Sequence, residues 1–231
     1  LPVSYTGDCT NVTSPDGCTA SASFAGDSNY ASSSDSESIT ITPASATLSL
    51  SNLAQTYDGT PKPVTVTTNP VSLSGVSVLY SSTTYPSSAT APSNAGSYDV
   101  LVSLSNTNYD ADDVTGSLVI SSASQTITFG ALGGKTYGDA DFSISATASS
   151  MLDVSFSSLT STVCTVSSST VHIVSAGECT LEASQAGNTN YEPAPLVQQS
   201  FTVAKATPTV SVSGGTFTYD GNPHPATGSV T

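Results

Sequence analysis

The sequence predicts an all-β chain of tandem immunoglobulin-like antiparallel β-sandwich modules that form an elongated rod or fibre. Two different turn markers recur in phase along the 231 residues, each at intervals of about 80 residues, which indicates repeated modules. Between the markers, apolar residues alternate with Ser or Thr, as in 47–51, 100–104 and 142–146. This period of two is typical of strands with one buried face, and no segment has a helical period.

Both markers combine a tyrosine with residues that favour turns. Asn side chains imitate backbone turns, and Asp and Gly accept left-handed backbone conformations. The tyrosine ring is expected to pack while its hydroxyl finds a backbone partner, as in a tyrosine corner. We therefore interpret both markers as structural turns, with ligand binding as the alternative. The first marker is Asn29-Tyr30, Asn108-Tyr109 and Asn190-Tyr191, and the second is Tyr57-Asp58-Gly59, Tyr137-Gly138 and Tyr219-Asp220-Gly221.

Module boundaries are predicted where a strand-like run is followed by a short stretch of Ala, Ser, Pro or Lys. Residues 43–121 and 122–205 are two complete modules. Residues 1–42 are the C-terminal half of a module, and residues 206–231 are the N-terminal part of a further one. Joints of a few residues limit bending, which favours a semi-rigid rod. The half-modules suggest a piece of a longer array, or halves that complement neighbouring subunits.

The charge balance excludes two classes of partner. The chain has 17 acidic residues, three lysines and no arginine, and its net charge is −14. So few cations cannot neutralise phosphates, which argues against nucleic-acid binding and against anionic membrane surfaces. Ser and Thr make up roughly a third of the chain, well above the usual share. Its polar surface therefore consists mainly of hydroxyl groups.

The four cysteines form two local pairs, Cys9 with Cys18 and Cys164 with Cys179. An even number and local spacing predict two disulfides and an oxidising, extracellular setting. A zinc site would need C-x₂-C spacing or nearby histidines, and neither is present. Asn11-Val12-Thr13 is an N-glycosylation sequon, but one sequon in so hydroxyl-rich a chain is close to chance.

A weak calcium candidate lies just after the second Asn-Tyr marker. Asp110, Asp112 and Asp113 provide hard oxygen ligands at close spacing. No known calcium-loop pattern accompanies them, so a solvated acidic loop is the preferred interpretation. The sequence thus predicts no metal and no cofactor.

Catalytic chemistry is not expected. His172 in a predicted strand and His224 in a predicted turn belong to different modules, and no nucleophile, base and acid converge. A Lys–Asn/Asp isopeptide cross-link needs a buried lysine, whereas Lys62 between two prolines and Lys135 in a Gly-rich turn are expected to be exposed. We therefore predict that the chain is not an enzyme.

Two sets of segments around the turn markers carry a family resemblance. The first set is residues 57–61, 93–98, 108–109 and 219–223, and the second is residues 125–129, 135–139, 163–166, 177–179 and 187–191. The first set resembles the YDG-type MBG module of bacterial surface proteins, and the second resembles its YGX-type relative. The resemblance implies immunoglobulin-like modules in long arrays of secreted or surface-anchored proteins, many of them adhesins, with no catalytic residues to transfer.

The expected function is a non-enzymatic structural segment of an extracellular bacterial surface protein or filament, such as a stalk, fibre body or surface scaffold. The alternative is a set of adhesin modules that bind a glycan or host protein directly. The expected partners are neighbouring modules of the same long chain, with head-to-tail copies in a filament as an open possibility. Neither nucleic-acid binding nor direct membrane insertion is expected.

Overall fold

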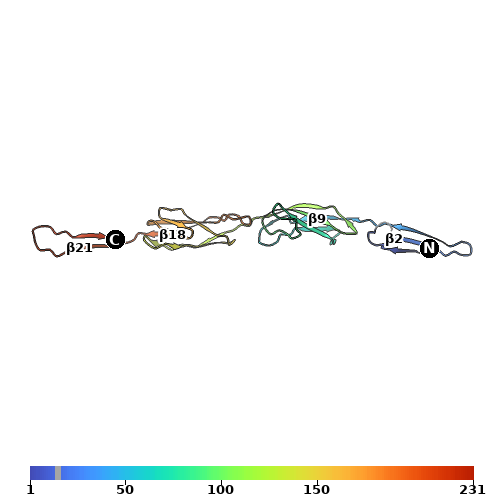
Figure 1. Ribbon diagram of the computed structural model, residues 1–231, viewed down its shortest axis with the longest axis horizontal. Coiled ribbons are helices and arrows are strands. Elements are labelled where there is room, and N and C mark those ends of the chain that lie inside the picture. Colours follow the sequence, from blue (N-terminus) through green and yellow to red (C-terminus); the bar gives the residue numbers. More distant parts are fainter. Residues whose placement is uncertain (14–16) are drawn as a thin grey trace. The chain divides into compact units, whose positions relative to one another are not determined.

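The computed structural model describes residues 1–13 and 17–231, and its regular elements are all strands (Figure 1). None of the described segments is a helix that could cross a membrane. The chain divides into two compact units, Leu1–Ala123 and Ser124–Thr231, whose boundary lies beside the joint predicted at residues 121 and 122. The predicted segments 1–42 and 43–121 lie in the same unit.

The first unit begins with a three-stranded antiparallel meander. Its strands are β1 (Val3–Gly7), β2 (Cys18–Phe24) and β3 (Ser33–Ile39), in the order β1-β2-β3. In the β1–β2 register Val3 lies opposite Ala22 and Tyr5 lies opposite Ala20. Because side chains alternate along a strand, these residues share one face, and the other face carries only Ser and Thr.

The rest of the first unit contains eight strands in three sheets. β5 pairs with β7, β4 pairs with β10, and the largest sheet has the order β6-β11-β9-β8. The strands are β4 (Ala44–Ser45), β5 (Thr47–Ser51), β6 (Ala54–Thr56), β7 (Thr65–Asn69), β8 (Val76–Ser81), β9 (Gly96–Leu104), β10 (Tyr109–Asp110) and β11 (Val114–Ser121).

One hydrophobic core lies within this part of the chain, between residues 48 and 120. Val100 and Val102 of β9 and Leu118 and Ile120 of β11 are almost completely buried, while the residues between them face outward. Leu48 of β5, which belongs to a different sheet, packs into the same core. The period of two seen in the sequence therefore corresponds to burial of every second residue.

The second unit has its own core, between residues 127 and 203. Its main sheets have the orders β13-β20-β19-β16 and β14-β18-β17, and β12 pairs with β15. The strands are β12 (Ile127–Phe129), β13 (Lys135–Thr136), β14 (Phe142–Ser143), β15 (Ala146–Ala148), β16 (Ser155–Ser158), β17 (Cys164–Ser167), β18 (Thr170–Ile173), β19 (Gly177–Ser184) and β20 (Val197–Ala204).

The same unit ends in a hairpin that contributes nothing to that core. β21 (Val210–Ser213) and β22 (Thr227–Val230) pair antiparallel, and every residue of both strands is exposed. The valines Val210, Val212 and Val230 are therefore open to solvent. Figure 1 shows this hairpin at the red, C-terminal end of the chain.

The sequence predicts antiparallel sandwich modules, and three of the strand pairings differ from that arrangement. β4 with β10, β6 with β11 and β13 with β20 are parallel. In the first unit the cause is a change of sheet: the chain leaves β5, which is antiparallel to β7, and then runs beside β11 as β6. Asn52 between β5 and β6 has a φ of 61°, a left-handed conformation that Asn tolerates better than most residues.

Leu118→Ala should destabilise the first unit by about 2–5 kcal/mol, because it leaves a cavity where a completely buried leucine packs. Val119→Ala in the next position is the matched control, since Val119 is 46% exposed on the opposite face of β11. It should change stability by less than about 0.5 kcal/mol. Urea unfolding measures both, and equal effects would contradict the assigned faces.

Candidate functional site

The three Asn-Tyr markers form the same hydrogen-bonded turn. In the second copy Asn106 Oδ1 accepts hydrogen bonds from the backbone N–H groups of Asn108, at 2.9 Å, and Tyr109, at 3.1 Å. In the third copy Asn188 Oδ1 accepts from the N–H groups of Asn190 and Tyr191, at 2.8 and 3.0 Å. A side-chain oxygen that accepts from the second and third following N–H groups defines an Asx turn.

The first copy uses an aspartate in the same role. Asp27 Oδ1 accepts from the N–H groups of Asn29, at 2.8 Å, and Tyr30, at 2.9 Å. The residue that makes each turn is thus the one three positions before the tyrosine, whereas sequence analysis singled out the Asn directly before it. The signal was present in the sequence, because Asp27, Asn106 and Asn188 are all residues that can accept in this way.

Asn108, which directly precedes Tyr109 in the second copy, links the predicted segment 1–42 to the predicted module 43–121. Asn108 Oδ1 accepts a hydrogen bond from Val12 N at 2.8 Å, and Asn108 Nδ2 donates to Asn11 Oδ1 at 3.0 Å. The Asx turn leaves this side chain free to point toward the 8–13 loop. Two side-chain hydrogen bonds therefore hold the 8–13 loop of the predicted segment 1–42 against the 106–109 turn of the predicted module 43–121.

The 8–13 loop is itself organised by a carboxylate. Asp8 Oδ1 accepts from the backbone N–H groups of Thr10 and Asn11, and Asp8 Oδ2 accepts from Asn11 Nδ2, each at 3.0 Å. These bonds, first of all that from the Asn11 backbone N–H, hold the pKa of the Asp8 carboxyl below its usual value. The sequon asparagine is consequently engaged on both sides, by Asp8 and by Asn108.

The tyrosines of the turns differ in exposure. Tyr30 is 71% exposed, whereas Tyr109 and Tyr191 are half-buried. Tyr98 makes the contact of a tyrosine corner instead, because its hydroxyl donates to Asn94 O, four residues upstream, at 2.9 Å. Burial raises the pKa of Tyr98, with a smaller contribution from the nearby Tyr85.

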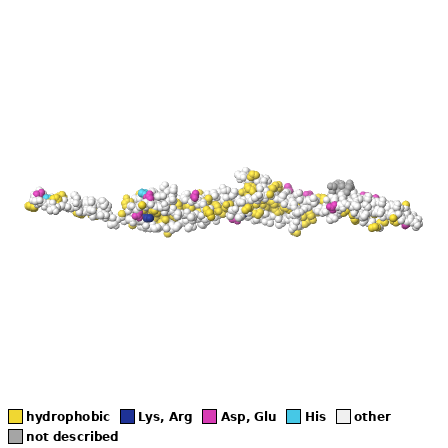
Figure 2. All heavy atoms as spheres, turned by 60° about the horizontal axis from the view of Figure 1, so that its bottom comes forward, with side chains coloured by type: hydrophobic (Ala, Val, Ile, Leu, Met, Phe, Trp, Pro, Cys, Tyr) yellow, Lys and Arg dark blue, Asp and Glu magenta, His cyan; other side chains and the backbone are white. Residues whose placement is uncertain are grey.

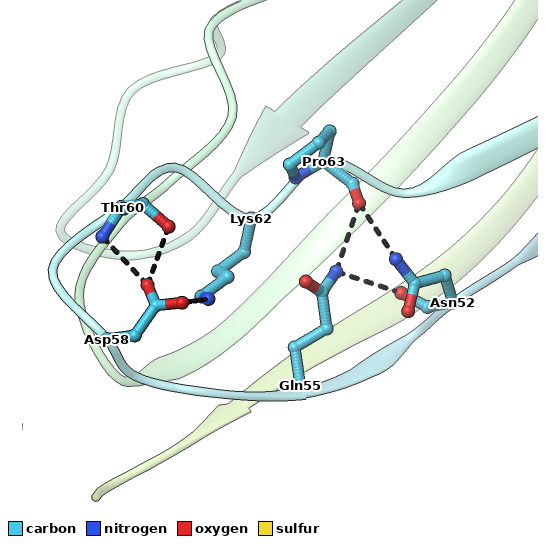
Figure 3. A network of polar contacts seen from close by, with 6 residues as sticks. All are labelled: Asn52, Gln55, Asp58, Thr60, Lys62 and Pro63. Atoms are coloured by element: carbon cyan, nitrogen blue, oxygen red, sulfur yellow. Dashed lines mark hydrogen bonds and ion pairs between the residues drawn. The ribbon is translucent and has the colours of Figure 1, made fainter.

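The second marker also forms turns, with a glycine in the left-handed region each time. Gly59, Gly138 and Gly221 have φ values of 83°, 94° and 77°. Asp58 Oδ1 accepts from Thr60 N at 2.9 Å and from Thr60 Oγ1 at 2.6 Å (Figure 3). In the corresponding turn at residues 219–222, Asp220 Oδ1 accepts from Asn222 N at 2.9 Å.

The expectation that Lys62 is exposed is wrong. Lys62 is 9% exposed, and its Nζ lies 2.5 Å from Asp58 Oδ2 (Figure 3). Its backbone N–H donates to Pro92 O at 2.9 Å, which draws this segment onto the module, so the aliphatic stem is covered while the ammonium group reaches the carboxylate. The contact with Lys62, followed by those with Thr60, lowers the pKa of Asp58 and keeps it ionised. An ionised carboxylate is a poor acceptor for an amine, so this pair is an ion pair rather than a poised cross-link.

Lys135 is also less exposed than the sequence predicts, and it lies in a strand rather than in a turn. It lies in the short strand β13, is half-buried, and places Nζ 4.5 Å from the centre of the Phe142 ring. A lysine over an aromatic face is a cation–π contact. The pairing of β13 with β20 brings this lysine onto the sheet and explains its partial burial.

Both predicted disulfides are present. Cys9 and Cys18 are bonded with their Cα atoms 4.9 Å apart, and Cys164 and Cys179 with theirs 5.7 Å apart. Among the described residues no cysteine is free. Cys164 and Cys179 are completely buried in the core of the second unit, so this bridge belongs to its packing.

The remaining candidates do not converge into one site. Within 1–13 and 17–231 no three His, Cys, Asp or Glu residues gather closely enough to hold a metal, so Asp110, Asp112 and Asp113 form no ligand cluster. His172 lies in the strand β18, where it faces outward, and its Nδ1 lies 2.8 Å from Asp141 Oδ1.

His224 lies in the loop of the C-terminal hairpin. Its ring stacks on that of Phe217, with centroids 4.4 Å apart, and its Nε2 lies 3.2 Å from Asp220 Oδ1. Both contacts lie within the loop that connects β21 to β22.

Comparison with known families identifies one part of the chain. Residues 46–124 match the family model of the MBG domain, a stretch that begins just before β5 and ends just after β11. This part of the chain is therefore an MBG domain, as the resemblance implied. No curated protein matches the chain significantly.

The unreduced protein, unfolded in denaturant, should show no free thiol by colorimetric titration, and four after reduction. Replacing Cys164 and Cys179 together by Ser should cost the second unit about 3 kcal/mol, because a bridge across 15 residues restricts the unfolded chain. Thiols in the unreduced sample, or an unchanged stability, would contradict the assignment.

Asp58→Asn should reveal a pH-dependent ion pair. Asn retains an oxygen for Thr60 but has no charge for Lys62. Because the folded-state pKa of Asp58 is lowered, its carboxylate stabilises the fold above an unfolded-state pKa of about 3.9, and this contribution is lost as the pH falls further. The difference in melting temperature between wild type and variant should thus be present at neutral pH and shrink in acid.

Lys62→Met provides the control for this measurement. In that background the pH-dependent effect of Asp58→Asn should be smaller, because only the hydrogen bonds from Thr60 still lower the pKa of Asp58. Added salt should weaken the effect in the wild-type background because Asp58 is exposed. A difference that is the same at every pH, or that is undiminished without Lys62, would rule out the ion pair as its main cause.

Proposed function

We propose that this chain is a non-enzymatic structural segment of an extracellular bacterial surface protein, serving as a stalk, fibre body or scaffold. The observation that carries the proposal is the contact of Asn108 with Asn11 and Val12, which bonds the predicted module 43–121 to the segment before it. A joint that combines a short linker with directed side-chain hydrogen bonds resists bending. Length and stiffness are the properties that a stalk needs.

The modules are proposed to be immunoglobulin-like β-sandwiches. In support, the β5–β7 sheet and the β6-β11-β9-β8 sheet both send side chains into one core, through Leu48 and through Leu118. In the second unit the β12–β15 pair and the β13-β20-β19-β16 sheet likewise share a core, through Ile127 and Leu181. Two sheets around one core is the defining feature of a sandwich.

An extracellular setting is supported by both disulfides, because such bonds persist mainly in oxidising compartments. The surface supports it as well. On the face shown in Figure 2, few charged side chains appear among the uncharged ones, in keeping with 9% charged residues in the whole chain. Hydroxyl groups on adjacent strands of the same sheet form hydrogen bonds with each other, as between Ser77 and Ser103 and between Thr180 and Ser200.

The stalk proposal can be tested by small-angle X-ray scattering of dilute protein. The wild-type chain should scatter as an extended particle of restricted flexibility, and Asn108→Ala should increase its flexibility by removing two hydrogen bonds at the joint. Asn29→Ala is the matched control, because Asn29 has the same place in the first turn but lies exposed at the opposite end of its segment.

Two outcomes would contradict the stalk. Scattering from a compact particle would exclude it, and so would an Asn108→Ala chain that scatters like wild type and like Asn29→Ala. Specific glycan binding on an array of immobilised glycans would favour the adhesin alternative instead.

A further inference from the structure

The three parallel strand pairs all join the first segment of a module to its last. β4 and β6 belong to residues 44–56, where the chain enters the predicted module 43–121, and β10 and β11 belong to residues 109–121, where the chain leaves it. In the predicted module 122–205, β13 follows the first strand β12, and its partner β20 is the last strand. Every other strand pair in the described part of the chain is antiparallel.

The two parallel pairs in the first unit share one register. Ala44 lies opposite Tyr109 in the β4–β10 pair, and Ala54 lies opposite Val119 in the β6–β11 pair, so each residue faces the one 65 positions later. The first and last segments of this module therefore run side by side in the same direction. Only β5 leaves this line, because it pairs with β7 in the other sheet.

Backbone hydrogen bonds join the two segments at both ends of this line. They include Ala44 N to Asn108 O, Ala46 N to Asp110 O, Val119 N to Leu53 O and Tyr57 N to Ser121 O, all at 2.8 or 2.9 Å. The last segment is thus bonded to the first before β5 begins and again after β5 ends.

In the second unit, side-chain amides replace part of this backbone ladder. β13 and β20 pair in parallel over only two residues. Two glutamines complete the link between the beginning and the end of the module, with Gln125 Nε2 donating to Glu192 O at 2.7 Å and Gln199 Nε2 donating to Phe129 O at 2.8 Å. Gln125 is buried at the entry to the module, and Gln199 lies in β20. The same connection is therefore made by different groups in the two modules.

The direction of paired strands decides how the bonds between them respond to tension. When a module is stretched between its two ends, the first strand is pulled toward its N-terminus and the last toward its C-terminus. In a parallel pair these forces oppose each other along the strands, so the bonds are loaded together. In an antiparallel pair both forces act at the same end and open the bonds one after another. Forced unfolding is governed by the unfolding rate, so bonds that must break together prolong the life of the folded module under load.

Side-chain hydrogen bonds hold β6 in place at its entry. Gln55 Nε2 and Asn52 Nδ2 both donate to Pro63 O, at 3.0 and 3.2 Å (Figure 3). The segment that contains Pro63 is itself fixed to the module, because Lys62 N donates to Pro92 O at 2.9 Å. Peeling that starts in β5 therefore meets these bonds at residue 52, before it reaches β6.

We propose that the parallel pairs are mechanical clamps through which each module carries tension along the chain. The first clamp consists of β4–β10 and β6–β11, and the second consists of β13–β20 and the bonds of Gln125 and Gln199. Under load the antiparallel pair β5–β7 opens early from one end, and the force then falls on β6–β11. The inference rests on the proposed stalk and adds that this stalk resists stretching as well as bending.

Single-molecule force spectroscopy of the 231-residue chain tests the proposal. Handles attached at Thr42 and Lys205 through azide-bearing residues load both modules in series and leave the cysteines paired. Wild type should show two high-force events. Reduction should lengthen the event of the second unit by about 50 Å, because the Cys164–Cys179 bridge spans 15 residues, which identifies that event.

A second placement of the handles provides a control without any change to the clamp. Thr42 and Ser72 lie near the same end of the β5–β7 pair, since Thr47 is opposite Asn69. Pulling between these two positions opens that pair bond by bond. The first module should therefore yield at a much lower force than when it is pulled between Thr42 and Lys205.

Two proline variants test the β6–β11 clamp directly. Val119→Pro removes the N–H group that donates to Leu53 O. Ser117→Pro is the matched control, because Ser117 is exposed on the same face of β11 but lies outside the stretch paired with β6. Under a fixed load Val119→Pro should shorten the lifetime of the first module about fivefold relative to Ser117→Pro, as expected for one lost hydrogen bond. The event of the second unit should not change in either variant.

Equal forces in the two handle placements would overturn the inference, as would equal lifetimes of the two proline variants under load. If either variant fails to fold, the comparison of handle placements in the wild-type chain decides by itself. Low-force modules in a chain that still scatters as an extended, semi-rigid particle would contradict the clamps and leave the stalk intact. Scattering from a compact particle would instead contradict the stalk, so the two failures are distinguishable.

Discussion

Burial of every second residue along short strands is the constraint on which this structure depends. β11 and β19 show it most clearly, because Leu118, Ile120, Leu181 and Ala183 are almost completely buried and the residues between them face outward. A module of about 80 residues has little interior, so a few such positions must provide most of its hydrophobic stabilisation. The buried Cys164–Cys179 bridge adds a covalent constraint where the core is small. The outward positions are then free to be Ser and Thr.

The Asx turns fix the loops between strands, and one of them also provides a contact between consecutive segments of the chain. In each copy a side-chain oxygen three residues before the tyrosine accepts two backbone N–H groups and so fixes the loop without a large core. In the second copy the side chain of Asn108 then points outward, where it forms hydrogen bonds with Asn11 and with the backbone N–H of Val12. The same Asx turn thus closes the 106–109 loop and positions Asn108 for its contact with the 8–13 loop. This link from sequence to joint is the basis of the structural function proposed for the chain.

Local features were predictable from the sequence, and features that depend on distant parts of the chain were not. The alternation of residues predicted strands, and cysteine spacing predicted both disulfides, because these signals act over a few residues. The parallel pairing of β6 with β11 joins residues that are 65 positions apart, as Ala54 and Val119 are, so no local sequence pattern indicates it. The burial of Lys62 could not be seen either, because it follows from the bond of its N–H to Pro92 O. Asn106 is a residue type that forms Asx turns, but the sequence alone does not distinguish the Asn106 side-chain oxygen from that of Asn108 as the acceptor of the backbone N–H groups.

Native-state hydrogen exchange read by residue tests the central account most directly. Slow exchange should be confined to two separate sets of amides, in β9 and β11 of the first unit and in β19 and β20 of the second, with different opening free energies because the two cores are independent. In dilute protein, amides of β21 and β22 should exchange rapidly, since every residue there is exposed. One uniform level of protection across residues 47–230, or none in β11 and β19, would contradict small modules held together by alternate burial.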